Sequence, residues 1–346
     1  MNYDIIKPYI EKGLVSEQAH PENEAVRIFN YTQECQFSKG WDDVTRQCRG
    51  LIMNVDTGEV IARPFPKFFN YQEHIANGWP VPAETPIVSE KLDGSLGILY
   101  HLNGKAWIAT RGSFKSDQAL WATDWWRKNM GTTVEDGFTH LFEIIYPENR
   151  IVVSYDFSGL VHLASLDTQT SRPSSITLYD MTGKPVRAAK QIATTSLEAL
   201  AEMDEPNSEG FVCYFPTANT RMKIKFPEYV RLHKIMTGLS EIGIWEGLAN
   251  GNKVDLADVP DEMFNWIKSV EGRLQAQVDA IESDAYAAVK EAEELPTRKE
   301  QAEVITKGTK YPGVAFAMLD KKDWEAIAWK MVRPKGGKTF KVDIDL

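Results

Sequence analysis

The residues best suited to covalent chemistry lie in one short stretch, Ser89-Glu90-Lys91-Leu92-Asp93-Gly94-Ser95, which has the pattern K-x-D-G. The amine of Lys91 is a nucleophile only when it is neutral, and its ordinary pKa is about 10.4. An exposed turn can carry the same residues, so the pattern alone does not separate a surface lysine from a reactive one. The rest of the sequence has to distinguish the two.

Further functional residue types follow in the order Arg111-Gly112, Glu143, Glu209-Gly210 and Lys223/Lys225. Polar and apolar residues alternate between Arg221 and Lys225, which predicts a strand with both lysines on one face. Cations near Lys91 would lower its pKa and would neutralise charge that develops on a phosphate. The ordered set therefore predicts attack of Lys91 on a nucleoside triphosphate.

Two acidic residues of this set suit a divalent cation. Glu143 and Glu209 supply the hard oxygen ligands that Mg²⁺ prefers, and Mg²⁺ usually keeps several waters, so few protein ligands are needed. Gly94 and Gly210 have no side chain, and we expect them to let the backbone approach the nucleotide closely.

Together these motifs resemble the covalent nucleotidyltransferase superfamily of ATP-dependent DNA and RNA ligases and mRNA capping enzymes. The resemblance is strongest to the T-even bacteriophage type of RNA ligase, which seals broken tRNA, and the Lys67-Phe68-Phe69 element separates this type from its relatives. The matching segments are Cys48-Arg49-Gly50, Lys67-Phe68-Phe69-Asn70, Glu90 to Ser95, Thr110-Arg111-Gly112-Ser113, Phe142-Glu143, Asn149-Arg150-Ile151-Val152, Glu209-Gly210-Phe211-Val212 and Lys223 to His233.

The resemblance implies a role for each matching residue. Lys91 would form a lysyl–AMP phosphoramidate, while Lys223 and Lys225 would contact the α-phosphate and assist departure of pyrophosphate. Asp255 or Asp258 would be a further acidic, metal-binding residue. The other implied ATP-binding residues are Glu90 at the adenine, Glu143 and Glu209 at the ribose or a metal-bound water, Arg49 and Lys67 at the triphosphate tail, Arg111 at the ribose or phosphates, and Phe69, Asp93 and Gly94 in the pocket.

One position departs from the pattern. Arg111 stands where the relatives most similar to this chain carry a lysine, and a guanidinium contacts an anion differently from an ammonium.

The implied reaction joins RNA ends and uses ATP with Mg²⁺ or Mn²⁺. Lys91 attacks ATP, AMP then passes to an RNA 5′-phosphate, and an RNA 3′-hydroxyl displaces AMP and seals the strand. The resemblance also implies RNA repair at single-stranded ends or at tRNA anticodon-loop breaks, with a separate end-healing kinase or phosphatase as a partner.

The composition is that of an ordinary globular protein, with 43% hydrophobic and 25% charged residues among 346. The net charge of −10 argues against non-specific coating of nucleic acid but allows a local basic groove. Cys35, Cys48 and Cys213 are expected to be free thiols in a reducing cytosol. No signal peptide and no apolar run of about 20 residues is evident. We therefore expect a cytoplasmic protein (host cytoplasm if viral) without membrane contact.

The pattern of elements predicts an α+β fold. Hairpins at 50–63 and 96–110, strands at 141–146, 151–153, 160–166, 176–179, 209–214 and 221–225, and a helix at 118–129 capped by Asp117 predict an antiparallel-sheet domain over residues 1–238. From 239 to 346, apolar residues spaced by three or four, notably over 261–295, predict a smaller all-helical C-terminal domain, including a helix at 321–331. The resemblance implies that the first is a nucleotidyltransferase (ATP-grasp-like) domain and that the second has a role in RNA specificity.

Two other functions were weighed. A DNA ligase or a GTP-using capping enzyme would carry a β-barrel OB domain after the last lysine motif, and the helical pattern there argues against both. A non-catalytic RNA-binding protein has no need of lysines at positions 91, 223 and 225. It would also carry a clearer basic surface than this chain, whose basic tail around Gly336-Gly337 is either solvated or an RNA-phosphate contact.

Overall fold

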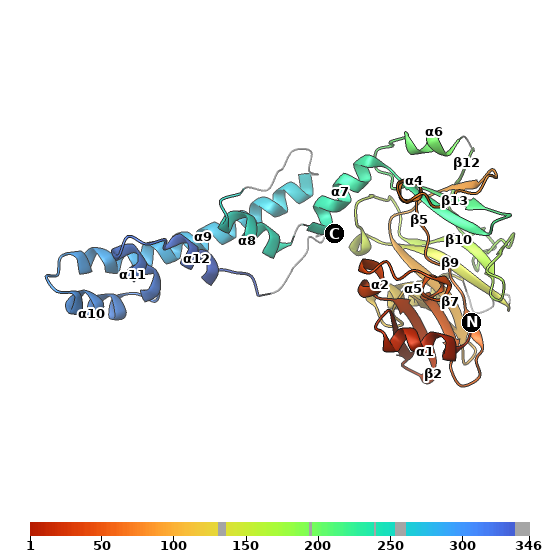
Figure 1. Ribbon diagram of the computed structural model, residues 1–346, viewed down its shortest axis with the longest axis horizontal. Coiled ribbons are helices and arrows are strands. Elements are labelled where there is room, and N and C mark those ends of the chain that lie inside the picture. The colour runs from red at the N-terminus through yellow and green to blue at the C-terminus, as the bar shows by residue number, and fades with distance from the viewer. Residues whose placement is uncertain (131–135, 194–195, 239, 253–260, 336–346) are drawn as a thin grey trace. The chain divides into compact units, whose positions relative to one another are not determined.

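The computed structural model describes residues 1–130, 136–193, 196–238, 240–252 and 261–335. The chain divides into two compact units, Met1–Arg231 and Leu232–Asp343, which Figure 1 shows. The division falls inside helix α7 (Pro227–Gly238), near the expected domain boundary after residue 238. Asp255, Asp258 and the part of the basic tail from residue 336 onward lie outside the described residues.

Unit 1 is an α+β unit with three sheets, as the sequence predicts. The first sheet has the order β1 (Val15–His20), β2 (Asn23–Tyr31), β3 (Arg49–Asn54), β4 (Val60–Ala62). The second has the order β11 (Pro173–Ser174), β10 (Gly159–Asp167), β9 (Phe138–Ile145), β7 (Ser95–Leu102), β8 (Lys105–Ala109). The third has the order β12 (Gln191–Ile192), β6 (Ile87–Glu90), β13 (Gly210–Phe215), β14 (Thr220–Lys225), β5 (Phe69–Asn70). Neighbouring strands pair antiparallel, apart from β5 beside β14.

Alternating apolar residues explain how the first two sheets stack. On β3, Ile52 enters a core that also contains Ile98 of β7, so the two sheets face each other there. Leu51, the neighbour of Ile52, points to the opposite face and packs with helix α1 (Tyr3–Glu11). Leu99, the neighbour of Ile98, packs with Trp126 of helix α5 (Asp117–Asn129). The stack is therefore two sheets with a helix on each outer face.

Shorter helices connect these layers, and one of them lies beside strands of the site. Helix α4 (Tyr71–Asn77) contacts β5 and β14, beside which it lies in Figure 1. Its first turn is closed by Glu73, whose Oε2 accepts hydrogen bonds from the backbone N and the side-chain Nδ2 of Asn70. The remaining short helices of unit 1 are α2 (Gln33–Phe37), α3 (Asp43–Gln47), the 3₁₀ turn η1 (Pro147–Asn149) and α6 (Leu197–Ala201).

Unit 2 is helical throughout its named elements. The predicted stripe of apolar residues forms one continuous helix, α9 (Asp261–Glu293), and its residues from Ile267 to Ala292 line the core of the unit. The other helices pack on this stripe: α8 (Glu241–Ala249), α10 (Arg298–Gly308), α11 (Pro312–Leu319) and α12 (Glu325–Met331). Trp245 of α8 donates an indole hydrogen bond to the carbonyl of Trp329 in α12 at 2.7 Å, which fixes the two helices to each other.

Several predicted elements are wrong in detail. Residues 151–153 form no strand, because a buried carboxylate binds the backbone N–H groups of Val152 and Val153. Residues 176–179 contribute only an isolated bridge between Tyr179 and Pro185. Ser116, not Asp117, caps α5, through a hydrogen bond from the backbone N of Ala119. The last helix begins at residue 325, since residues 321 and 322 still close the end of α11.

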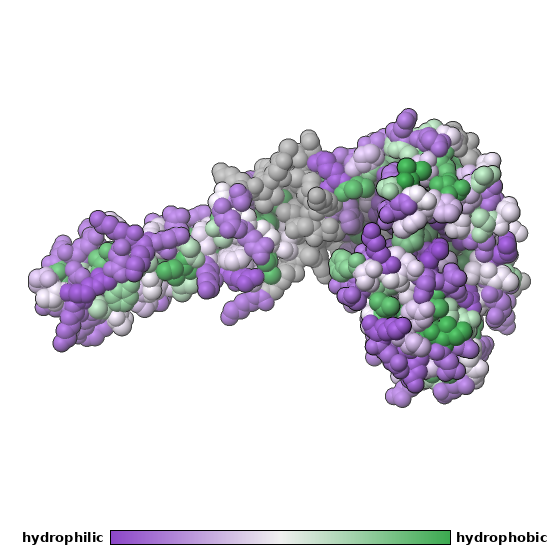
Figure 2. Space-filling view, viewed as in Figure 1, coloured by the Kyte–Doolittle hydropathy of each residue, from purple (hydrophilic) through white to green (hydrophobic). Residues whose placement is uncertain are grey.

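The surface is consistent with a fold whose apolar faces are covered and whose outer faces meet solvent. On the face that Figure 2 shows, apolar side chains of unit 1 form scattered patches within a largely hydrophilic surface. Among the described helices, none has both the length and the apolar character to cross a membrane.

Candidate active site

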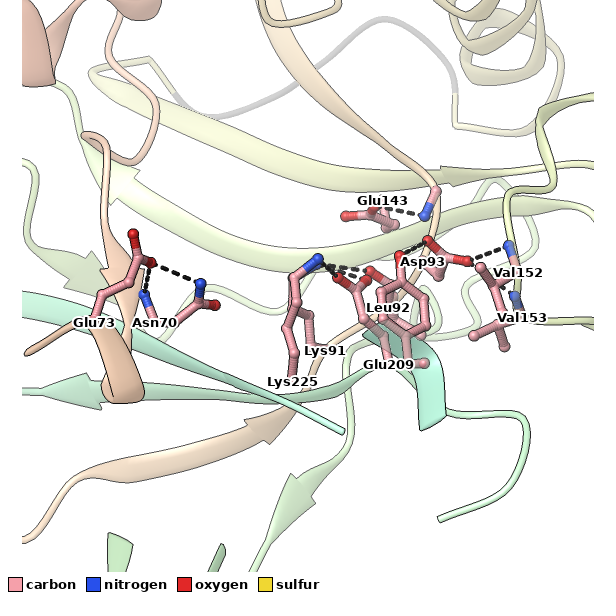
Figure 3. A network of polar contacts seen from close by, with 12 residues as sticks. Asn70, Glu73, Lys91, Leu92, Asp93, Glu143, Val152, Val153, Glu209 and Lys225 are labelled. Atoms are coloured by element: carbon pink, nitrogen blue, oxygen red, sulfur yellow. Dashed lines mark hydrogen bonds and ion pairs between the residues drawn. The ribbon is translucent and has the colours of Figure 1, made fainter. Parts of the chain in front are cut away.

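The backbone of Lys91 is fixed by the third sheet. Lys91 follows β6, and its backbone N donates to the carbonyl of Gly210 at 2.8 Å, which continues the pairing of β6 with β13. Its side-chain Nζ lies 2.7 Å from Oε2 of Glu209. The other oxygen, Oε1, lies 2.9 Å from Nζ of Lys225 on β14. One carboxylate that is only 3% exposed is thus shared by two lysines, as Figure 3 shows.

This contact reverses the predicted electrostatics of Lys91. Burial opposes the charged form, but the neighbouring carboxylates, Glu209 first and then Glu143, outweigh it and hold the pKa of Lys91 above its ordinary value. The expectation that nearby cations lower this pKa is therefore wrong, because the carboxylates are the dominant neighbours. The amine becomes a nucleophile only after the influence of Glu209 and Glu143 is offset.

The lowered pKa belongs to Lys223 instead. Burial, followed by the positive charges of Lys67 and Lys225, lowers the pKa of Lys223 to about 7. The side chain comes from the same face of β14 as Lys225, in agreement with the predicted alternation. A bound anion would restore the ammonium form, so this position is suited to a phosphate.

Glu143 on β9 is a partly buried acidic residue of the site. Its Oε1 accepts a hydrogen bond from the backbone N of Gly94 at 2.9 Å. Burial, together with the like charges of Glu209 and Asp93, raises the pKa of Glu143 to about 7. A neighbouring positive charge would lower that pKa and favour the carboxylate.

These carboxylates fit a water-rich cation site rather than an all-protein one. Within the described ranges, no three His, Cys, Asp or Glu side chains gather closely enough to hold a metal. Mg²⁺ is commonly held by one or two carboxylates and several waters. Glu143 and Glu209 satisfy that requirement, and their burial and the raised pKa of Glu143 are what a divalent cation would offset.

The carboxylate of Asp93 is buried and binds neighbouring protein groups rather than solvent. Its Oδ2 accepts hydrogen bonds from the backbone N–H groups of Val152 and Val153, at 2.7 and 2.9 Å, and its Oδ1 accepts one from the hydroxyl of Tyr229 at 2.7 Å (Figure 3 shows the backbone contacts). Its backbone N donates to the hydroxyl of Tyr155. The carboxylate thus ties the loop that carries Lys91 to a distant segment and to α7.

The two motif glycines are required by close approach of protein backbone. A Cβ on Gly94 would lie 2.5 Å from the carbonyl oxygen of Ile144 on β9. A Cβ on Gly210 would lie 2.0 Å from the carbonyl oxygen of Ile224, and Gly210 also has a φ of +137°. The expectation that these glycines also let the backbone approach the nucleotide stays a prediction.

Three cations of the motifs gather around Tyr31, a residue outside every motif: Arg49, Lys67 and Arg111. Arg111 donates a hydrogen bond from Nη1 to the hydroxyl of Tyr31 at 3.0 Å. The ammonium of Lys67 lies 5.5 Å from the centroid of the same ring. Arg49 on β3 donates to the carbonyl of Phe65 at 3.3 Å. The positive charge of Arg49 contributes to the lowered pKa of Lys223, so these cations share one electrostatic environment.

The remaining expected residues lie at the margins of this cluster. Glu90, the last residue of β6, accepts a hydrogen bond at Oε1 from the backbone N of Lys190 at 2.8 Å. Phe69 on β5 pairs in register with Met222 of β14. Arg221 was missed by the sequence reasoning, although it continues the alternation of Lys223 and Lys225, and its guanidinium stacks on Phe65 at 4.1 Å.

Residues 47–229, more than half of the chain, match the model of a family described as RNA ligase. The chain belongs to the RNA ligase family. The match includes every predicted site residue from Arg49 to Lys225 and ends at Tyr229, the partner of Asp93. Tyr31 and the helices of unit 2 lie outside it.

Individual relatives agree with this family assignment. The chain is 32% identical over 216 residues to a protein of Thermovibrio ammonificans with a provisional RNA ligase name, which covers 57% of this chain and 55% of that protein. It is 28% identical over 243 residues to a protein of Autographa californica nuclear polyhedrosis virus, provisionally named a bifunctional polynucleotide kinase/RNA ligase, covering 60% of this chain and 35% of that protein. The chain thus spans about half of one relative and a third of the other.

Among solved structures, an archaeal ATP-dependent RNA ligase is similar with a TM-score of 0.45 and 13% identity, covering 89% of this chain and 76% of that one.

Proposed function

We propose that this RNA ligase family member is an ATP-dependent enzyme that joins RNA 3′-hydroxyl and 5′-phosphate ends through a covalent lysyl–AMP on Lys91. The observation that carries the proposal is the position of Lys91, whose Nζ contacts the buried carboxylate of Glu209 and is influenced by the charge of Glu143, beside the lysine face of β14. A surface lysine has no need of that arrangement.

The first step requires Lys91 to lose the proton that Glu209 now stabilises. The neutral Nζ attacks the α-phosphorus of ATP, a nitrogen–phosphorus bond forms, and the bond from that phosphorus to the bridging oxygen breaks. Pyrophosphate leaves with both bonding electrons, and Lys223 and Lys225 stabilise its charge. A divalent cation, Mg²⁺ or Mn²⁺, would supply positive charge at Glu143 and Glu209.

The second and third steps transfer AMP and then release it. An oxygen of the RNA 5′-phosphate attacks the phosphorus of lysyl–AMP, the nitrogen–phosphorus bond breaks, and Lys91 regains its amine. The RNA 3′-hydroxyl then loses its proton and attacks the RNA 5′-phosphorus, which expels AMP and closes the strand. The cations at β14 stabilise charge in both displacements.

The finer assignments rest on the motif resemblance and stay proposals. Arg49, Lys67 and Arg111 would bind the triphosphate, and Glu90 would read the adenine. Single-stranded RNA ends, including tRNA anticodon-loop breaks of the kind that T-even phage ligases repair, would be the substrate, with an end-healing kinase or phosphatase as partner. Residues 1–238 would form the adenylyltransferase domain, and the helical domain over 239–346 would choose the RNA.

Labelling with ATP tests this proposal directly. The full chain is incubated with α-phosphate-labelled ATP and Mg²⁺ and then denatured, and label is expected to stay on the protein. The matched control is Lys91→Arg, which keeps a cation for Glu209 but lacks a nucleophilic amine, and it should take no label. Absence of label from the natural chain with ATP, GTP, Mg²⁺ or Mn²⁺ would refute the proposal. Labelling by GTP alone would indicate a capping-type enzyme instead.

A further inference from the structure

An aromatic cluster lies at the open end of the third sheet, and the proposed reaction does not use most of it. The ring of Phe69 on β5 lies 5.6 Å from Trp41, 5.0 Å from Trp79 and 6.5 Å from His74, centroid to centroid. Trp79 and His74 are themselves 5.5 Å apart at 87°. All four side chains are partly exposed, and Ile75 beside them is 60% exposed. These rings are therefore not an enclosed core.

The backbone is shaped to hold Trp79 in this cluster. Helix α4 ends at Gly78, whose φ of +64° is the left-handed conformation that glycine adopts readily. The turn lets the backbone N of Trp79 donate to the carbonyl of His74 at 2.9 Å, which brings the indole back over the helix and against Phe69.

A cation without an acidic partner lies against the same rings. The ammonium of Lys67 is 5.1 Å from the centroid of Trp41 and 5.2 Å from that of Phe69. In the part of the chain that the structure describes, no carboxylate pairs with it. An ammonium held by π-faces rather than by an acid keeps its attraction for an anion.

The cluster also continues the row of functional residues across the sheet. Phe69 and Asn70 pair in register with Met222 and Lys223 of β14, so the rings begin one strand beyond the lysine face. Lys91 follows β6, which lies on the opposite side of β14 from β5, beyond β13. A polynucleotide whose terminal phosphate meets β14 has its neighbouring base within reach of Phe69 and Trp79.

We propose that Trp79 and His74, with Phe69 and Trp41, form a stacking platform for a base of the single-stranded RNA end. Lys67 beside it, which would bind the triphosphate in the first step, would contact an RNA backbone phosphate after pyrophosphate has left. Flat rings next to an unpaired cation match the two parts of a nucleotide, its base and its phosphate. The inference rests on the proposed function and adds to it the residues that bind the RNA. Stacking accepts any base, so the platform predicts affinity for single strands with little sequence preference.

The test uses the full chain without ATP and a fluorescein-labelled single-stranded oligoribonucleotide with a 5′-phosphate. Fluorescence anisotropy should show that Trp79→Ala weakens binding by about 5- to 100-fold, the loss measured for one stacked base. Trp79→Phe keeps a ring and should stay within about threefold. Trp79→Leu keeps apolar bulk but lacks a π-face, so it should weaken RNA binding by the same factor as Trp79→Ala. It keeps the test decisive if the alanine variant folds poorly. Tyr179→Ala, which removes a 57% exposed aromatic residue elsewhere in unit 1, is the control.

Labelling with ATP, run on the same variants, separates this inference from the proposed function. Normal labelling with weakened RNA binding in Trp79→Ala and Trp79→Leu supports the platform. RNA binding equal to that of the natural chain in Trp79→Leu overturns it, as does competition by duplex RNA as strong as by single strands. If the variants need a higher ATP concentration for labelling but bind RNA with unchanged affinity, the platform is refuted and the rings are an adenine site instead. If the natural chain binds RNA through Trp79 but takes no label, the platform stands and the proposed function fails.

Discussion

Replacing Glu209 by glutamine is expected to change the reactivity of Lys91 in a direction that can be measured without any turnover. Glu209 holds Lys91 at 2.7 Å and Lys225 at 2.9 Å, and it is the largest of the interactions that raise the pKa of Lys91. Glutamine keeps the shape but removes the negative charge. Burial and the positive charge of Lys225 then act on Lys91 with less opposition, so its pKa should fall.

The size of the change follows from the geometry. Two unit charges 2.7 Å apart interact by on the order of 6 kcal/mol at an effective dielectric constant of about 20. The side chain of Lys91 is 21% exposed, and Glu143 remains, so water and the second carboxylate replace much of this interaction. The part of the interaction that is not replaced should lower the pKa of Lys91 and raise the fraction of neutral amine at a given pH. Loss of one partner from this buried group should also lower the free energy of unfolding by about 2–4 kcal/mol.

The assay follows acetylation of Lys91 by an amine-reactive reagent over a pH series, with mass spectrometry to quantify each lysine. In Glu209→Gln the midpoint for Lys91 should move to lower pH, while exposed Lys105 serves as the internal reference. Glu228→Gln is the matched control, since Glu228 pairs with Arg231 on the surface of α7. A midpoint for Lys91 that is unchanged or moves to higher pH in Glu209→Gln would refute the reasoning.

Four further predictions concern the lysines of β14, Asp93 and a glycine of β13. Lys223→Ala and Lys225→Ala should each reduce ATP labelling by on the order of 100-fold. Because the pKa of Lys223 is lowered to about 7, its ammonium opposes folding fully at pH 7 and below and progressively less as pH rises towards 10.5. Lys223→Ala should therefore raise the free energy of unfolding at pH 7 by on the order of 2 kcal/mol, with the gain shrinking at higher pH in denaturation curves. Asp93→Asn should cost roughly 2–4 kcal/mol in the same assay, because an amide replaces a carboxylate that accepts three hydrogen bonds. Gly210→Ala should prevent folding, as judged by circular dichroism, whereas Gly58→Ala, at a positive φ with open space around it, should cost only about 1 kcal/mol.

Local periodicity was sufficient for the elements whose neighbours in space are neighbours in sequence. The hairpins β3–β4 and β7–β8 and the long helix α9 could be predicted because turn residues and apolar spacing act within a few residues. The segment 151–153 could not. Its valines are typical of a strand, but the carboxylate of Asp93, 59 residues earlier for Val152, takes its backbone N–H groups.

The features of the candidate site also divide into those that could be predicted from the sequence and those that could not. The order of motif residues identified Lys91, Glu209 and the lysines of β14, because residue type and alternation are written in the sequence. It did not give the sign of the charge effect on Lys91, which depends on whether its nearest neighbour is Glu209 or Lys223. It also passed over Tyr31, whose contacts with Lys67 and Arg111 join segments 36 and 80 residues away; only the folded sheets bring them together.

Two residues of the site have pKa values shifted in opposite directions, and this bears on what the site binds. Burial, with the neighbouring cations Lys67 and Lys225, lowers the pKa of Lys223 to about 7. Burial, with the carboxylates of Glu209 and Asp93, raises the pKa of Glu143 to about 7, although the charge of Lys91 opposes that rise. A lone anion would relieve Lys223 but worsen Glu143, and a lone cation would do the reverse. A triphosphate that arrives with a divalent cation corrects both at once. In the proposed reaction the cation would also offset the carboxylates that keep the proton on Lys91, so nucleotide binding and activation of Lys91 would be coupled.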